Sequence, residues 1–98
     1  MREMQSKSGK TTVKVIKHII LKNYWEYYIV NDDEMQYDEK NDIQFAYVIG
    51  HTQEFGDVSM KEAKPFIISE TTNLNDVAPA PDWVWLDQKK YIKKETLK

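Results

Sequence analysis

The stretch DIQFAYVIG, residues 42–50, carries the clearest strand pattern in this chain of 98 residues. Successive side chains of a strand point to opposite faces of the sheet, so a half-buried strand alternates large apolar residues with smaller or polar ones. Here one face takes Ile43, Phe45, Tyr47 and Ile49, and the other takes Gln44, Ala46 and Val48. We therefore expect a strand over residues 43–50, which Gly50 ends.

Two strands are expected before this one. Residues 12–22 are dominated by β-branched residues, and residues 24–31, YWEYYIVN, combine aromatic and β-branched residues; both kinds favour strands. We expect residues 24–31 to pair with residues 43–50 in an antiparallel sheet. Trp25 is expected to face the core, and the opposite face, which carries Glu26, is expected to be wetter.

A short helix and further strands are expected after Gly50. A short strand is expected around residues 57–59, and SMKE then has a serine three residues before a glutamate, the capping-box spacing that places Ser59 at a helix N-terminus. Pro65 limits that helix to one or two turns, after which FII predicts another strand. In a final strand, Trp83 and Trp85 would face the same side and cover one edge of the core. These elements predict an α+β fold with a mainly antiparallel sheet of four to five strands and one short helix.

The length allows one domain, because single cores commonly hold about 50–200 residues. We expect one globular domain over residues 12–87, between a basic, flexible N-terminus (1–11) and a lysine-rich tail (88–98). The chain has no cysteine, which excludes disulfides and thiolate zinc sites. It also has no apolar run near the roughly 20 residues of a membrane helix. A soluble, cytoplasmic protein is expected.

The formal net charge of −2 conceals a segregation of charge along the chain. Residues 1–22 hold six basic side chains and one acidic, residues 23–70 hold three basic and eleven acidic, and residues 71–98 hold five basic and four acidic. The centre is therefore acidic between basic ends. Such a centre repels nucleic-acid phosphates, whose binding depends on lysine and arginine, and favours basic partners.

The acidic residues concentrate in NDDEMQYDEKND, residues 31–42, between two predicted strands. A calcium loop needs oxygen ligands at alternating positions and then a glycine, but Lys40 interrupts the only such phase and no glycine follows before Gly50. No metal site is expected. Two interpretations stay open: a solvated hairpin connection, and a surface that recognises a basic partner. The candidate partner-binding residues are Asp32, Asp33, Glu34, Asp38, Glu39 and Asp42.

Catalytic and nucleic-acid sites have weaker support. His51 precedes two carboxylates and His18 lies far away in sequence, but the chain contains no nucleophile elbow, phosphate-binding glycine loop or zinc histidine pair. We therefore predict that the protein is not an enzyme and uses no cofactor. Four aromatic residues could form a stacking platform for single-stranded nucleic acid: Trp25, Tyr27, Phe45 and Tyr47. Burial in the core, with Trp25 and Phe45 largely covered, is the favoured interpretation.

Three segments, NYWEYYIV, FAYVIG and EFGDVSMKE, resemble a small family of unknown function found on plasmids, phages and integrated elements. Its pattern has a tryptophan–aromatic strand, an acidic connection, an F-x-Y-V-x-G strand and an E-x-G-x-x-S-x-x-E stretch. The matching positions are Trp25, Tyr27, Tyr28, Phe45, Tyr47, Val48, Gly50, Glu54, Gly56, Ser59 and Glu62. The sequence departs from the family at Ala46, Asp57 and Val58, and it lacks the usual leading L-P-x-L-Y. The resemblance implies a mobile-element accessory protein and transfers no catalytic residue.

The predicted function is therefore non-enzymatic. We expect a phage or mobile-element protein that binds a basic host protein through its acidic surface, for instance as an inhibitor of a nuclease or another nucleic-acid-acting defence component. The alternative is a nucleic-acid-binding accessory module that uses the basic ends and the aromatic strands.

Overall fold

The computed structural model describes residues 1–31 and 42–88. The elements follow in the order β1 (Arg2–Ser6), β2 (Thr12–Leu21), β3 (Glu26–Val30), β4 (Ile43–Ile49), β5 (Gln53–Ser59), α1 (Met60–Ala63), the 3-10 turn η1 (Lys64–Phe66), β6 (Ile67–Thr71) and β7 (Trp83–Trp85). All strand pairs are antiparallel, in the order β5-β4-β3-β2-β1-β7, with β6 paired to β2. The expected α+β fold is confirmed, but the sheet has seven strands in the described residues rather than four to five.

The predicted pairing of residues 24–31 with residues 43–50 is confirmed by β3 and β4. Their register sets Tyr28 opposite Tyr47 and Tyr27 opposite Val48. Residues opposite each other in a sheet share a face. Tyr28 and Tyr47 therefore lie on one face of the sheet, and Tyr27 lies on the other.

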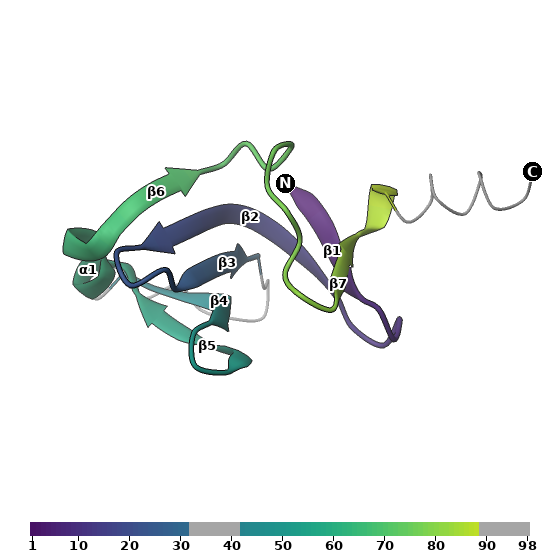
Figure 1. Cartoon of the computed structure of the whole chain (residues 1–98), viewed down its shortest axis with the longest axis horizontal. Coiled ribbons are helices and arrows are strands. Elements are labelled where there is room, and N and C mark those ends of the chain that lie inside the picture. The colour runs from purple at the N-terminus through teal and green to yellow at the C-terminus, as the bar shows by residue number, and fades with distance from the viewer. Residues whose placement is uncertain (32–41, 89–98) are drawn as a thin grey trace, which may run out of the picture.

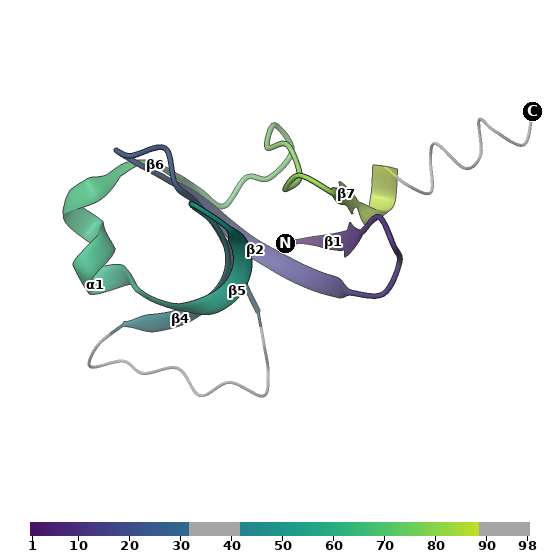
Figure 2. The ribbon, with the colours of Figure 1, turned by 60° about the horizontal axis from the view of Figure 1, so that its bottom comes forward.

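Strand β2 is the centre of the sheet. Along one edge it pairs with β3, and along the other its first half pairs with β1 while its last residues pair with β6. The register with β3 shifts between Val15 and Lys17, and the register with β6 shifts between Ile20 and Leu21. Such shifts bend and twist a strand. In Figure 1 the bent β2 curves past its two partners β1 and β6. Figure 2 shows that the strands from β2 to β6 curl round, so that α1 closes one end.

The sheet has a hydrophobic cluster on each face. The cluster toward α1 contains Ile19, Leu21, Ile29, Ala46, Val58, Met60 and Ala63. The opposite cluster contains Met4, Val15, Tyr28, Tyr47, Leu74, Ala80, Trp83 and Trp85, and it is covered by β7 and the segment that precedes it. The expectation of a wetter face on β3 is therefore wrong: Tyr28 and Val30 are only 2% and 8% exposed, because the later part of the chain folds back over them.

The other sequence predictions have mixed outcomes. Ser59 caps α1 as expected, since its hydroxyl accepts a hydrogen bond from the Glu62 backbone N–H at 3.2 Å. Trp83 and Trp85 are both buried on one side of β7. The N-terminus expected to be flexible contains strand β1, held between β2 and β7. In the tail, residues 89–98 lie outside the described residues.

Candidate functional site

Five of the six acidic residues predicted to bind a partner, from Asp32 to Glu39, lie outside the described residues. The sixth, Asp42, immediately precedes β4 and has a left-handed backbone with φ of 50°. Its carbonyl oxygen accepts a hydrogen bond from the Met60 N–H at 2.9 Å, and its carboxylate accepts one from the Gln44 amide at 3.3 Å. The last residue of the acidic connection is thus fixed against the first residue of α1.

A pocket of about 580 Å³ lies between the β2–β3 turn, the end of β5 and the α1–η1 segment. Its apolar lining comes from Leu21, Trp25, Tyr27, Val58, Ala63 and Phe66. Its polar lining comes from Lys22, Asn23, Asp57, Ser59 and Glu62. This volume lies within the roughly 300–1,000 Å³ that small-molecule sites occupy. Partial burial beside the pocket raises the pKa of Tyr27.

Backbone hydrogen bonds hold the walls of this pocket together. In the β2–β3 turn, the Leu21 N–H donates to the Trp25 carbonyl and the Tyr24 N–H donates to the Leu21 carbonyl, both at 2.9 Å. The Lys22 N–H donates to the Phe66 carbonyl at 2.8 Å, which joins this turn to η1. The pocket is therefore formed before any ligand arrives, and less conformational entropy is lost on binding.

Trp25 is fixed from behind by Gly50. A Cβ atom at Gly50 would lie 2.8 Å from three ring atoms of Trp25, so only glycine lets the ring approach this closely. The His51 ring meets the Trp25 ring edge-on, with 5.3 Å between their centroids. Trp25 is half-buried rather than largely buried as expected, because its remaining surface lines the pocket.

Exposed aromatic residues and carboxylates surround this pocket. Tyr24 is 81% exposed and Phe66 56% exposed, both unusual for aromatic side chains. Tyr24 also has a positive φ of 66°, a conformation that is uncommon for a bulky residue. Asp57 and Glu62 are exposed, and neither forms an ion pair with any residue that the structure describes.

A second, polar groove of about 430 Å³ is lined by His18, Glu26, Asp76 and the start of the segment before β7. The His18 ring is buried, and its Nε2 lies 2.8 Å from a Glu26 carboxylate oxygen. The Tyr28 hydroxyl donates to the Ala78 carbonyl at 2.8 Å. Burial, reinforced by the Glu26 charge, raises the pKa of Tyr28 well above its usual range. His18 and His51 thus have different partners, Glu26 and Trp25, and sequence reasoning missed the His18–Glu26 pair because these residues belong to different strands.

The four aromatic residues of the suggested stacking platform separate onto different faces. Trp25 and Tyr27 pack beside the cluster toward α1. Phe45 stacks on Phe55 with 5.5 Å between the ring centroids, and Tyr47 contacts both Phe55 and Trp83 on the opposite face. Phe45 is half-buried, not largely buried. The β3–β4 register thus excludes a single platform of these four rings.

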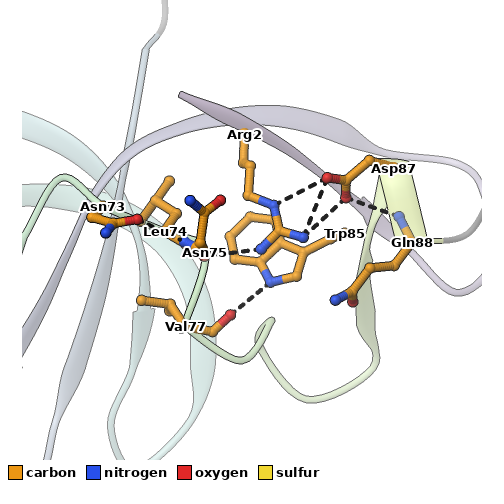
Figure 3. A network of polar contacts seen from close by, with 8 residues as sticks. All are labelled: Arg2, Asn73, Leu74, Asn75, Val77, Trp85, Asp87 and Gln88. Atoms are coloured by element: carbon orange, nitrogen blue, oxygen red, sulfur yellow. Dashed lines mark hydrogen bonds and ion pairs between the residues drawn. The ribbon is translucent and has the colours of Figure 1, made fainter.

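Arg2 forms a clamp between the beginning and the end of the described fold. Its guanidinium lies 4.4 Å from the centre of the Trp85 ring, donates to the Leu74 carbonyl at 2.9 Å and pairs with the Asp87 carboxylate at 3.0 Å. The Trp85 indole N–H donates to the Val77 carbonyl at 2.8 Å. Figure 3 shows how the segment carrying these carbonyls, β1 and the end of the described chain meet around Trp85. We interpret the clamp as structural, because its polar groups are bound to one another.

Within the described part of the chain, no group of three or more histidine, aspartate or glutamate side chains is arranged to hold a metal ion. No helix there combines the length and the apolar character that a membrane span requires. No protein-family model, curated protein or solved structure matches this chain. The resemblance to a mobile-element family therefore stays a prediction.

Proposed function

We propose that this chain is a non-enzymatic accessory protein of a phage or mobile element, and that it binds a basic host protein through its acidic surface. The partner class we favour is a nuclease or another nucleic-acid-acting defence protein. The observation that carries the proposal is the distribution of charge: eleven acidic and three basic side chains between residues 23 and 70. The electrostatic field of such an excess of acidic side chains accelerates the association of oppositely charged partners.

Contacts of the described residues support this proposal. The hydrogen bond from Met60 to Asp42 joins the end of the acidic connection to α1, the helix that carries the exposed Glu62. Strand β5, which leads into α1, adds the exposed Glu54 and Asp57. The described ion pairs of Lys17 and Arg2 involve other acidic residues, so they do not neutralise these carboxylates.

The test begins with a pull-down of partners from a host lysate and continues with association kinetics. A triple variant, Asp33→Asn, Asp38→Asn and Glu39→Gln, should slow capture of the partner by roughly tenfold at low salt. The difference from the unaltered protein should shrink as salt rises, because the screening length falls from about 10 Å at 0.1 M to about 3 Å at 1 M. Unchanged association at low salt would mean that the connection is only solvated.

A matched control removes the same number of charges elsewhere. Glu3→Gln, Asp76→Asn and Asp82→Asn neutralise three exposed carboxylates that lie outside residues 23–70. This variant should associate at nearly the rate of the unaltered protein. Salt-dependent binding of the isolated chain to DNA or RNA, with no capture of a basic protein, would instead favour the nucleic-acid-binding module, with the exposed Lys7, Lys10 and Lys14 as its phosphate contacts.

A further inference from the structure

We propose that the pocket between the β2–β3 turn, the end of β5 and α1 is the binding site for an arginine side chain of the partner protein. This inference rests on the proposed function for the identity of the partner. Its own basis is the combination of a preformed aromatic wall with carboxylates that form no ion pair with any described residue. We call this site the arginine pocket, and its central residues are Trp25, Tyr27, Asp57, Glu62 and Phe66.

The chemistry of the lining favours a long cationic side chain. Aromatic rings attract cations through the negative charge of their faces, and a guanidinium stacks on them more readily than an ammonium because it is planar and weakly hydrated. Its aliphatic stem suits the apolar surface of Leu21, Val58 and Ala63. Asp57 and Glu62 bring two negative charges to the lining, against one positive charge from Lys22.

The protein already uses this arrangement inside its own fold. Arg2 lies 4.4 Å from the centre of the Trp85 ring, and the Asp87 carboxylate pairs with its guanidinium at 3.0 Å. A backbone carbonyl, that of Leu74, accepts a further guanidinium N–H. The arginine pocket offers the same groups, a tryptophan ring beside carboxylates, without an arginine to fill it among the described residues.

The exposed aromatic residues beside the pocket extend the contact surface. Tyr24 projects from the β2–β3 turn and Phe66 from η1, and the hydrogen bond from the Lys22 N–H to the Phe66 carbonyl holds these two segments together. Tyrosine, tryptophan and arginine are the residues that most often dominate protein–protein binding. We expect Tyr24 and Phe66 to contact the partner around the inserted arginine.

The test uses a small probe on the isotope-labelled full chain. N-acetylargininamide is titrated while the tryptophan indole and backbone amide resonances are followed, and N-acetylcitrullinamide serves as the neutral probe of nearly the same shape. The arginine derivative should shift the Trp25 indole resonance and the amides of α1 in a saturable manner. The indole resonance of Trp85, which is buried and bound to Val77, should stay in place. The citrulline derivative should bind at least several-fold more weakly, because it lacks the charge.

Variants assign the binding to the pocket. Glu62→Gln and Asp57→Asn should each weaken the arginine derivative by about two- to fivefold, as expected for exposed charge pairs, whereas Asp82→Asn, an exposed carboxylate that does not line the pocket, should change nothing. Trp25→Leu should abolish binding, and Phe66→Ala, at a 56% exposed side chain, provides a second aromatic variant if the first does not fold. Equal shifts with both probes, or shifts that leave Trp25 and α1 unaffected, would overturn the proposal.

The outcomes separate this proposal from the proposed function. If the arginine derivative binds at the pocket but the chain captures no basic protein, the arginine pocket stands and the proposed function fails. If the chain captures a basic partner at a rate that is insensitive to Asp57→Asn and Glu62→Gln, and the arginine derivative does not bind, the proposed function stands and the arginine pocket is wrong.

Discussion

Replacing Arg2 tests which contacts of the clamp stabilise the fold. Arg2→Met retains most of the aliphatic stem but removes three interactions: the cation–π contact with Trp85, the hydrogen bond to the Leu74 carbonyl and the ion pair with Asp87. A partly desolvated cation–π contact contributes about 0.5–2 kcal/mol, and a hydrogen bond from a charged group contributes about 1.5–3 kcal/mol. The Arg2 side chain is only 14% exposed, so solvent screens its contacts with the Trp85 ring and the Leu74 carbonyl little. We expect Arg2→Met to lower the free energy of unfolding by about 2–4 kcal/mol.

Asp87→Asn is the matched variant, because it removes the ion pair and leaves the other two contacts of Arg2 in place. The Asp87 side chain is 66% exposed, and exposed ion pairs contribute about 0.2–1 kcal/mol. The hydrogen bonds from Arg2 lower the pKa of Asp87. Its contribution is therefore present above the pKa of the unfolded chain, about 3.9, and is lost as the pH falls below that value. The small difference between Asp87→Asn and the unaltered protein at pH 7 should disappear in acid.

Urea unfolding followed by tryptophan fluorescence measures both variants. Arg2→Lys adds a third point, since it keeps the charge but loses the planar fork of donors, and its loss of stability should fall between the other two. An equal loss for Asp87→Asn and Arg2→Met would refute the reasoning, because it would mean that the exposed ion pair, and not the stacking on Trp85 and the bond to Leu74, holds the clamp closed.

The remaining predictions concern three positions in the sheet and at α1. Gly50→Ala should destabilise the fold by about 1–3 kcal/mol and shift the indole resonance of Trp25, because the added methyl group displaces the ring; an unchanged indole resonance would contradict the close approach. Ser59→Ala should lower the free energy of unfolding by about 0.5–2 kcal/mol through loss of the helix cap, while Ser59→Asp, which restores a cap, should recover most of it. Tyr28→Phe should cost about 1 kcal/mol near neutral pH by leaving the Ala78 carbonyl without its donor. Because the folded-state pKa of Tyr28 is raised above its ordinary value of 10.0, the stability that its protonated phenol contributes is present below about pH 10 and is lost as the pH rises beyond it; the same alkaline loss in Tyr28→Phe would exclude Tyr28 as its source.

The local features of the fold could be predicted from the sequence. Alternation in residues 43–50 predicted β4, and the spacing of Ser59 and Glu62 predicted the start of α1, because both signals depend on neighbouring residues. Strand β1 could not be recognised in this way. Its position between β2 and β7 depends on the pairing of Met4 with Trp85, residues from opposite ends of the sequence.

The candidate site was harder to predict for a similar reason. The β3–β4 register decides that Tyr47 shares a face with Tyr28 and not with Tyr27, and no single strand reveals the register of its partner. The arginine pocket combines three segments, and the hydrogen bond between Lys22 and Phe66 that joins two of them spans the three strands and the helix α1 that lie between β2 and η1. In the sequence, the neighbouring Tyr24 and Trp25 form part of an aromatic stretch typical of a core strand. Nothing in that pattern indicates that Tyr24 is exposed and that Trp25 lines a pocket.

Strand β2 has a further consequence for the dynamics of the protein. Its residues contribute Val15 to one hydrophobic cluster and Ile19 and Leu21 to the other, so neither cluster can open completely without disturbing the same strand. Amide protons in the middle of β2 should consequently exchange with deuterium only in global unfolding events, whereas those of β7, which is three residues long and has one neighbour, should exchange through local opening of the sheet edge. Motion would then be concentrated at the β7 edge of the sheet, while the strand between the clusters stays closed.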